Sequence, residues 1–268
     1  MSTYPYAQRG VTMNLSLISK NAAKKAYGSA YRARWGFTPP PSWSDWSSYE
    51  HMLRVIQRER IAEVPGDVLE IGVLLGGGTY KLCKYFQQVA PTKRVIAVDI
   101  FDPDFDLTPA GDGRTMAELY ADALAGRGQR EVFDEVTSGC ANLTVIEADS
   151  AKVELPVDRI AFAYVDGNHS APYVRSDFEL VWSRLSPGGV LAFDDYGLDL
   201  TEVTYTLHEL IGEHAGEVER MWLGGEGKKI IFIQRRVEAG SVNGAHLEWE
   251  NNESRVRRAA RFFVTSLR

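Results

Sequence analysis

One stretch of the chain, Val68–Thr79, constrains the fold more than any other. It begins as an apolar run that reaches Glu70 and Gly72, and three further glycines at 76–78 then open an amphipathic segment. A buried strand, a glycine turn and a helix in this order form the first β-α unit of an open α/β sheet. Because glycine lets the backbone approach a ligand and a helix N-terminus offers unpaired N–H groups, this turn is a candidate binding site.

The spacing of the glycines indicates which ligands do not suit the turn. Three residues separate Gly72 from Gly76, which differs from the G-x-G-x-x-G pattern of dinucleotide-binding folds. Glu70 would in addition repel a pyrophosphate, whereas it suits a ligand with a cationic or hydroxyl-rich part. We therefore disfavour a nicotinamide or flavin dinucleotide, and we expect Glu70, Gly72, Gly76 and Thr79 to contact another cofactor.

Composition narrows the class of protein. The chain has 268 residues and is 44% hydrophobic, which is enough to bury a full core as one domain with extensions. Its formal net charge of −6 argues against nucleic acid as a partner. Cys83 and Cys140 lie far apart without CxxC spacing and predict neither a disulfide framework nor a zinc site. Without a leader pattern or an apolar run near the ~20 residues of a membrane helix, we expect a cytoplasmic protein with no membrane partner.

Apolar runs separated by helix-length segments recur along the chain, which is typical of a parallel sheet covered on both faces. The five predicted parallel strands are residues 68–71, 94–99, 143–147, 160–166 and 189–194. Residues 218–223 and 229–235 flank a glycine-rich turn and predict a hairpin, so the sheet gains an antiparallel edge. A helix should precede the first strand, with Ser47 or Ser48 as its cap, and stop at Pro65-Gly66.

Three segments lie outside this pattern. Residues 1–44 form an aromatic arm that packs on the body or a second subunit, or acts as a lid over a substrate. Residues 101–136 are long for a β-α connection, and insertions of that length beside strand ends are usually functional. The main domain, residues 45–236, contains this lid-like insert, and residues 237–268 form a tail with a basic helix. A docking or dimerisation role suits that helix in an acidic chain, so we expect a homo-oligomer.

Acidic residues follow every predicted parallel strand, at the edge where ligands bind in open α/β sheets. Turn chemistry explains one or two of them, but five together need a further reason. Asp99, after the second strand, can accept hydrogen bonds from a ribose diol. Asp149 and Ser150, after the third, are placed to meet an adenine edge.

The acids after the fourth and fifth strands indicate a metal site. Asp166, Asp194 and Asp195 would repel one another unless a divalent cation neutralised them. All-oxygen ligation suits Mg²⁺, Mn²⁺ or Ca²⁺ rather than zinc. His169 lies three residues beyond Asp166 and is our candidate general base, with Asp166 as the other candidate proton acceptor.

Five motifs together carry a family resemblance, and they fall within residues 45–235: Val64–Val73, Ala97–Asp99, Asp166–His169, Leu185–Gly189 and Phe193–Tyr196. With them the chain resembles the S-adenosylmethionine-dependent O-methyltransferases of the seven-stranded Rossmann-like fold. Among these it is most similar to the metal-dependent macrocin (tylosin-type) and mycinamicin sugar O-methyltransferases and their cephalosporin-pathway relatives. The segment Leu74–Thr79 departs from the Trp-Arg-Gly-Gly-Ser-like continuation that is frequent in that family.

The resemblance implies a fold and an activity. The expected fold is the Rossmann-like seven-stranded methyltransferase fold, with a mostly parallel sheet and an antiparallel C-terminal hairpin. S-adenosylmethionine would be bound by Glu70, Gly72 and Asp99, with Asp149 and Ser150 near its adenine and Asp166 at its reactive end. Mg²⁺ would be held by the three aspartates named above, and His169 would be the base.

The function expected from these residues is Mg²⁺-dependent methylation of a hydroxyl on a small natural product, plausibly a sugar of a glycosylated metabolite such as an antibiotic. The alternatives are methylation of a catechol or another phenol by the same fold, and a non-catalytic cofactor-binding partner protein. The arm and the insert match no known pattern, so the acceptor stays open.

Overall fold

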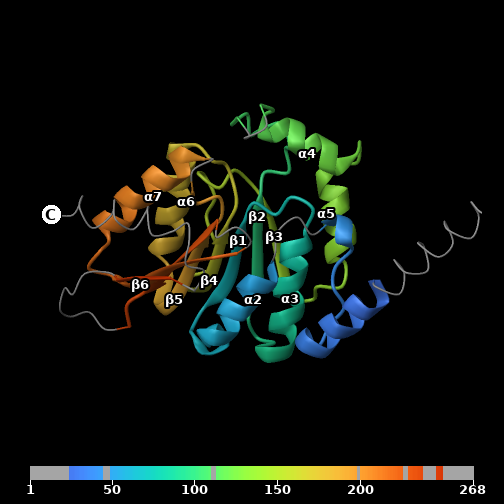
Figure 1. The fold of residues 1–268 in the computed structure, drawn as a ribbon, viewed down its shortest axis with the longest axis horizontal. Coiled ribbons are helices and arrows are strands. Elements are labelled where there is room, and N and C mark those ends of the chain that lie inside the picture. The colour runs from blue at the N-terminus through green and yellow to red at the C-terminus, as the bar shows by residue number, and fades with distance from the viewer. Residues whose placement is uncertain are drawn as a thin grey trace, which may run out of the picture.

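The computed structural model describes residues 24–44, 49–109, 113–197, 200–225 and 229–237, and the backbone of residues 246–249. One sheet with strand order β3-β2-β1-β4-β5-β7-β6-β8 runs through these residues (Figure 1). Its first five strands pair in parallel, and β7 is antiparallel to both β5 and β6. The strands are β1 (Asp67–Ile71), β2 (Val95–Asp99), β3 (Leu143–Glu147), β4 (Ile160–Val165), β5 (Leu185–Phe193), β6 (Val218–Gly224), β7 (Ile230–Arg235) and β8 (His246–Trp249).

The first seven strands confirm the predicted α/β class, with its parallel sheet and antiparallel hairpin. Strand β5 begins four residues before the predicted start at residue 189, because Leu185 already pairs with Ile160 across a register shift. Strand β8, which pairs in parallel with β6, was not predicted. Its sequence, His-Leu-Glu-Trp, alternates polar and apolar residues, but four residues are too few for this pattern to identify a strand.

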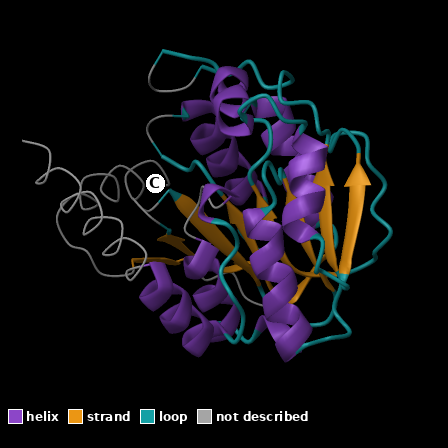
Figure 2. Cartoon of the chain, turned by 90° about the vertical axis from the view of Figure 1, so that its right-hand side faces the viewer, coloured by secondary structure: helices purple, strands orange, loops and turns teal. Residues whose placement is uncertain are grey.

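Helices cover both faces of the sheet (Figures 1 and 2). On one face, α6 (Ala171–Trp182) and α7 (Thr201–Glu213) bury apolar side chains such as Phe178 and Leu207 against the strands. On the other face, α2 (Tyr49–Arg58) and α3 (Gly77–Val89) share a core with the helix at residues 24–35. Strands buried from both sides explain why the apolar runs in the sequence are continuous rather than alternating.

The helix before β1 ends earlier than predicted, at Arg58 instead of Pro65-Gly66. Arg60 adopts a left-handed conformation with φ 53°, which a right-handed helix cannot continue. Ile61 therefore begins a separate 3-10 turn, η2 (Ile61–Glu63), although its side chain is fully buried. The predicted caps Ser47 and Ser48 lie outside the described residues.

The insert after β2 contains two helices, α4 (Met116–Leu124) and α5 (Gln129–Thr137). Thr115 and Glu118 form a capping box at the start of α4, since each side chain bonds the backbone N–H of the other. Phe133 of α5 is buried against the sheet. In Figure 1 these green helices lie above the ends of the central strands, so the insert borders the edge where a ligand would bind.

The part of the aromatic arm that the structure describes is packed on the body. Trp35 meets Tyr85 of α3 with ring centroids 6.3 Å apart, and Phe37 meets Tyr80 at 6.2 Å, both in edge-to-face geometry. Tyr4 and Tyr6 of the arm and the predicted basic helix after residue 250 lie outside the described residues. None of the helices in the described ranges combines the length and apolarity needed to cross a bilayer.

Candidate active site

Two adjoining pockets lie at the carboxyl ends of the parallel strands. The first pocket is bounded by the ends of β1 to β4, and its lining includes Asp99, Asp149 and Ser150. The second pocket lies between the start of α2, the β1–α3 turn, α4 and the start of β7, and its lining includes Asp194 and Asp195.

Four residues line both pockets and form their common boundary: Gly72, Leu74, Tyr120 and Asp166. Gly72 has a φ of 80°, and a Cβ atom at this position would lie 2.0 Å from the carbonyl oxygen of Asp166. Only glycine fits such an approach in the left-handed conformation. The turn therefore needs Gly72 so that the ends of β1 and β4 can meet.

Asp99 is held firmly at the floor of the first pocket. Its Oδ2 accepts a hydrogen bond from the backbone N–H of Val73 at 2.8 Å, and its Oδ1 accepts one from Phe101 at 2.7 Å. Gln129 of α5 donates a further, longer bond to Oδ1 at 3.3 Å. Burial raises the pKa of Asp99, but these donors stabilise the carboxylate and oppose that rise. The side chain is therefore a preorganised acceptor facing the pocket.

Asp149 and Ser150 line the same pocket beyond β3. The Ala151 N–H donates to Asp149 Oδ1 at 3.0 Å, and Lys152 Nζ lies 2.7 Å from Oδ2. The Lys152 ammonium holds the pKa of Asp149 below its ordinary value. Tyr173 of α6 lies at this end of the first pocket and does not reach the second.

Three of the predicted cofactor contacts lie behind the pocket instead of in its lining: Glu70, Gly76 and Thr79. Glu70 is fully buried and accepts a hydrogen bond from the Thr79 hydroxyl, while its Oε1 has no partner among the described residues. Burial raises the pKa of Glu70 to about 8. Gly76 packs toward Phe133, as the left-handed N-cap of α3.

Carboxylates crowd together at the ends of β4 and β5. Burial raises the pKa of Asp166 well above its ordinary value, and the charges of Asp194 and Asp195 add to the rise. Burial and the charge of Asp195 likewise raise the pKa of Asp194. Asp194 is oriented by the Tyr164 hydroxyl and by the N–H of Asp195, which donates at 2.8 Å. Lys229 offsets part of this charge, since it opposes the rise in the pKa of Asp194.

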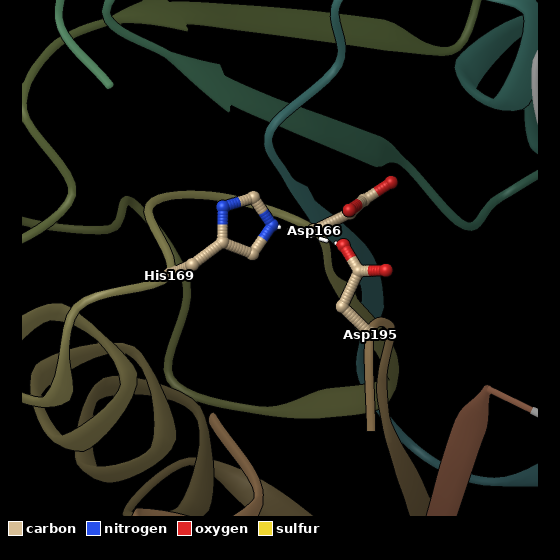
Figure 3. Close-up of side chains that lie close together, drawn as sticks. All are labelled: Asp166, His169 and Asp195. Atoms are coloured by element: carbon tan, nitrogen blue, oxygen red, sulfur yellow. Dashed lines mark hydrogen bonds and ion pairs between the residues drawn. The ribbon is translucent and has the colours of Figure 1, made fainter. Parts of the chain in front are cut away.

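His169 joins this group, and Figure 3 shows it beside Asp166 and Asp195. Its two ring nitrogens each face a carboxylate. Its Nε2 lies 3.0 Å from Asp195 Oδ2, and its Nδ1 lies 2.8 Å from Asp106 Oδ2. Burial disfavours the charged ring, yet these two carboxylates outweigh it and raise the pKa of His169 to about 10. Asp195 reaches its position with a left-handed backbone, φ 53°, a strain that is often found at functional sites.

The donor set fits a divalent cation. Asp166, His169 and Asp195 each offer one ligand atom, and these atoms all lie within 4.8 Å of one another. A bound cation would relieve the repulsion that raises the pKa values of Asp166 and Asp194. The structure thus brings His169 into the carboxylate group, with Asp194 turned toward Tyr164.

Two residues of the site were missed in the sequence, Asp106 and Tyr120, and both lie in the insert. Asp106 is buried, and the N–H of Thr108 donates to its Oδ1 at 2.9 Å, which leaves Oδ2 for His169. In the sequence it is one of three aspartates within five residues, Asp102, Asp104 and Asp106, and nothing singles it out. Asp106 and His169 are 63 positions apart, so no local pattern indicates that they pair.

Comparison with known proteins agrees with this geometry. A family described as a methyltransferase domain matches residues 69–196. The match spans the glycine turn and the acidic ends of β2 to β5, and it contains all of the predicted site residues. No curated protein matches the chain.

Several solved structures are similar to this chain in fold. The O-methyltransferase NovP is 18% identical over 68% of this chain and 79% of its own, with a TM-score of 0.52. MycE from the mycinamycin pathway, in complex with Mg, SAH and mycinamycin VI, is 17% identical over 80% of this chain and 56% of its own, with a TM-score of 0.47. SAH-bound PaMTH1 from Podospora anserina is 14% identical over 88% and 99%, with a TM-score of 0.45. The likeness to NovP confirms the Rossmann-like methyltransferase fold.

Proposed function

We propose that this chain is an S-adenosylmethionine-dependent O-methyltransferase that uses a divalent cation, Mg²⁺ in the first instance, and methylates a sugar hydroxyl of a small glycosylated metabolite. The observation that carries the proposal is the meeting of Asp166, Asp195 and a braced His169 beside the boundary between the two pockets. Deprotonation of an acceptor and donation of a methyl group would then take place side by side. The methyltransferase family match supports the transfer of a methyl group.

The first pocket suits the cofactor. Asp99 keeps lone pairs free after its backbone bonds, which are suited to a ribose diol. Asp149 and Ser150 lie farther along the sheet edge, where an adenine attached to that ribose would extend. The sulfonium end of S-adenosylmethionine would then point from Asp99 toward Gly72 and Asp166, and so toward the second pocket.

The second pocket suits the acceptor. Asp166 and Asp195 would hold the cation with Asp194 beside them, and the cation would neutralise these carboxylates and increase the acidity of a nearby hydroxyl. Asp106 accepts the Nδ1–H of His169. A cation bound by Asp195 would weaken the hold of that carboxylate on Nε2 and lower the pKa of the ring from about 10, which would free Nε2 to take a proton. Asp106 also stabilises the imidazolium that this transfer forms.

The reaction balances with these groups. The acceptor O–H proton passes to Nε2 of His169, the oxygen forms a bond to the methyl carbon, and the carbon–sulfur bond breaks to leave a neutral thioether. Holding both reactants in line removes much of the entropic barrier. His169 contributes as general base, and Asp106 acts through it as a positioning residue.

The test is a mass-spectrometric screen with S-adenosylmethionine and Mg²⁺. The acceptors would be glycosylated polyketides, free and nucleotide-linked sugars, and catechols. We expect a mass gain of one methylene on a sugar and its loss when a chelator is added. Methylation of catechols alone would favour the phenol alternative. Cofactor binding is measured by calorimetry. The proposal is contradicted if S-adenosylhomocysteine fails to bind or if NAD binds equally well.

A further inference from the structure

Tyr120 lies at the point where the two pockets meet. It belongs to α4, the first helix of the insert, and it lines both the first and the second pocket. Of the four boundary residues it is the one with an aromatic ring, since Gly72 has no side chain, Leu74 is aliphatic and Asp166 belongs to the carboxylate group. Tyr120 therefore lines the boundary across which a ligand in the first pocket would reach the second.

The chemistry of the boundary favours a cation. Burial and the charges of Asp166 and Asp106 raise the pKa of Tyr120, so its phenol stays neutral. The face of an aromatic ring carries negative electrostatic potential and attracts a cation within about 6 Å of its centroid. The surrounding carboxylates have the same sign of potential, so the boundary as a whole attracts positive charge.

We propose that the ring of Tyr120 contacts the methylsulfonium group of the bound cofactor and directs its methyl toward the second pocket. The inference rests on the proposed function. With ribose at Asp99 and adenine beyond it, the sulfur is one carbon away from the ribose, in the direction of Gly72 and the boundary. The cation that reaches Tyr120 is then the sulfonium, the charged atom that donates the methyl.

The sulfonium charge separates this role from a purely structural one. S-adenosylmethionine carries the charge and S-adenosylhomocysteine does not, while the rest of the two molecules is the same. Calorimetry with both ligands would be run on the wild-type chain, Tyr120→Leu and Tyr120→Phe. We expect Tyr120→Leu to weaken S-adenosylmethionine roughly 2- to 30-fold more than S-adenosylhomocysteine, and Tyr120→Phe to keep the wild-type ratio.

Tyr173→Leu is the matched control, because Tyr173 lines the first pocket alone. It should weaken both ligands by the same factor. Binding of S-adenosylhomocysteine reports whether each variant is folded, and Tyr120→Met would replace Tyr120→Leu if the latter fails to bind it. Equal losses for both ligands in the Tyr120 variant, or no loss for either, would overturn the inference while leaving the proposed function intact. A wild-type chain that binds neither ligand would overturn both.

Discussion

The two sides of the ligand edge carry the same residue type in opposite electrostatic states. On the side of β2 and β3, Asp99 and Asp149 are held by backbone N–H groups, and Lys152 pairs with the second of them. On the side of β4 and β5, Asp166 and Asp194 lie beside Asp195, and burial together with the neighbouring like charges raises their pKa values.

This difference distinguishes two uses of an aspartate. A carboxylate already stabilised by fixed donors stays ionised and can accept hydrogen bonds from a neutral ligand such as a diol. Buried carboxylates that crowd one another repel, and a bound divalent cation would relieve that repulsion. The hydrogen-bond donors and charges around each aspartate therefore predict what that side of the sheet edge binds. The presence of aspartates alone does not.

The largest expected effect is on the metal. Exhaustive chelation should abolish turnover and added Mg²⁺ should restore it, because the crowded carboxylates need a counterion. Mg²⁺ or Mn²⁺ should also raise the melting temperature of the wild-type chain, by mass action on the folded state, and Asp195→Asn should remove that rise. Asp149→Asn removes one negative charge on the side of β2 and β3, and this variant should keep the rise in melting temperature. If both variants lose this rise in melting temperature equally, the metal site is not specific to the side of β4 and β5.

The next effect is on the base. His169→Ala should lower turnover roughly 10²–10⁴-fold with the acceptor found in the screen, which is the usual contribution of a positioned base. Asp106→Asn should lower it less, roughly 10- to 100-fold, since it disturbs only the orientation and tautomer of the ring. Binding of S-adenosylhomocysteine should be unchanged in both variants. Wild-type turnover in His169→Ala would mean that Asp166 or another group takes the proton.

A smaller effect is expected on the cofactor side. Asp99→Ala should weaken S-adenosylhomocysteine roughly 10- to 100-fold in calorimetry, which corresponds to hydrogen bonds accepted by a charged group. Stabilisation by Mn²⁺ should stay, because Asp99 is not among the grouped ligand atoms. If Asp99→Ala instead removes stabilisation by metal and leaves the cofactor affinity unchanged, the two sides have been assigned the wrong way round.

The smallest effect comes from Asp177 of α6, a fully buried acid that lies close to Ser150 and Asp149. Burial raises its pKa to about 7, so between its unfolded value of 3.8 and pH 7 the folded state binds more protons than the unfolded state. The contribution to stability is therefore full below about pH 4 and is lost as the pH rises through 7.

Asp177→Asn should remove this pH dependence and should be more stable than the wild type at pH 8, on the order of 2 kcal/mol. Denaturant unfolding at pH 5 and pH 8 measures the difference. A gap between variant and wild type that does not grow with pH would show that Asp177 is paired, and that burial is not enough to keep an acid protonated here.

Much of this arrangement could be predicted from the sequence because it follows local rules. Buried parallel strands leave continuous apolar runs, and each strand end is followed by its acid, so residues such as Asp99 and Asp166 could be placed at one edge. Which acids face a pocket depends on packing between distant segments. Glu70 has the same local setting as Asp99, yet Thr79 and the neighbouring core enclose it.

The insert could not be predicted to the same extent. Its acids and glycines suggested an irregular loop, whereas the structure contains two helices, one of them with a capping box at Thr115. Asp106 and Tyr120 gain their roles from contacts with β4 and β5, which no pattern within the insert encodes. The early end of α2 likewise depends on a single backbone torsion at Arg60.

The close approach of Gly72 to the Asp166 carbonyl has a consequence for how such a protein can change. The boundary between the pockets is built partly from main chain, so its shape does not depend on which side chains surround it. Under the proposed function, substitutions in the insert or at the start of α2 can change the shape of the acceptor pocket. The main-chain contact between Gly72 and Asp166, beside which the methyl group would be transferred, would stay the same. For an engineer, retargeting this scaffold to new acceptors should begin with Met116 and its helix, and leave Gly72 untouched.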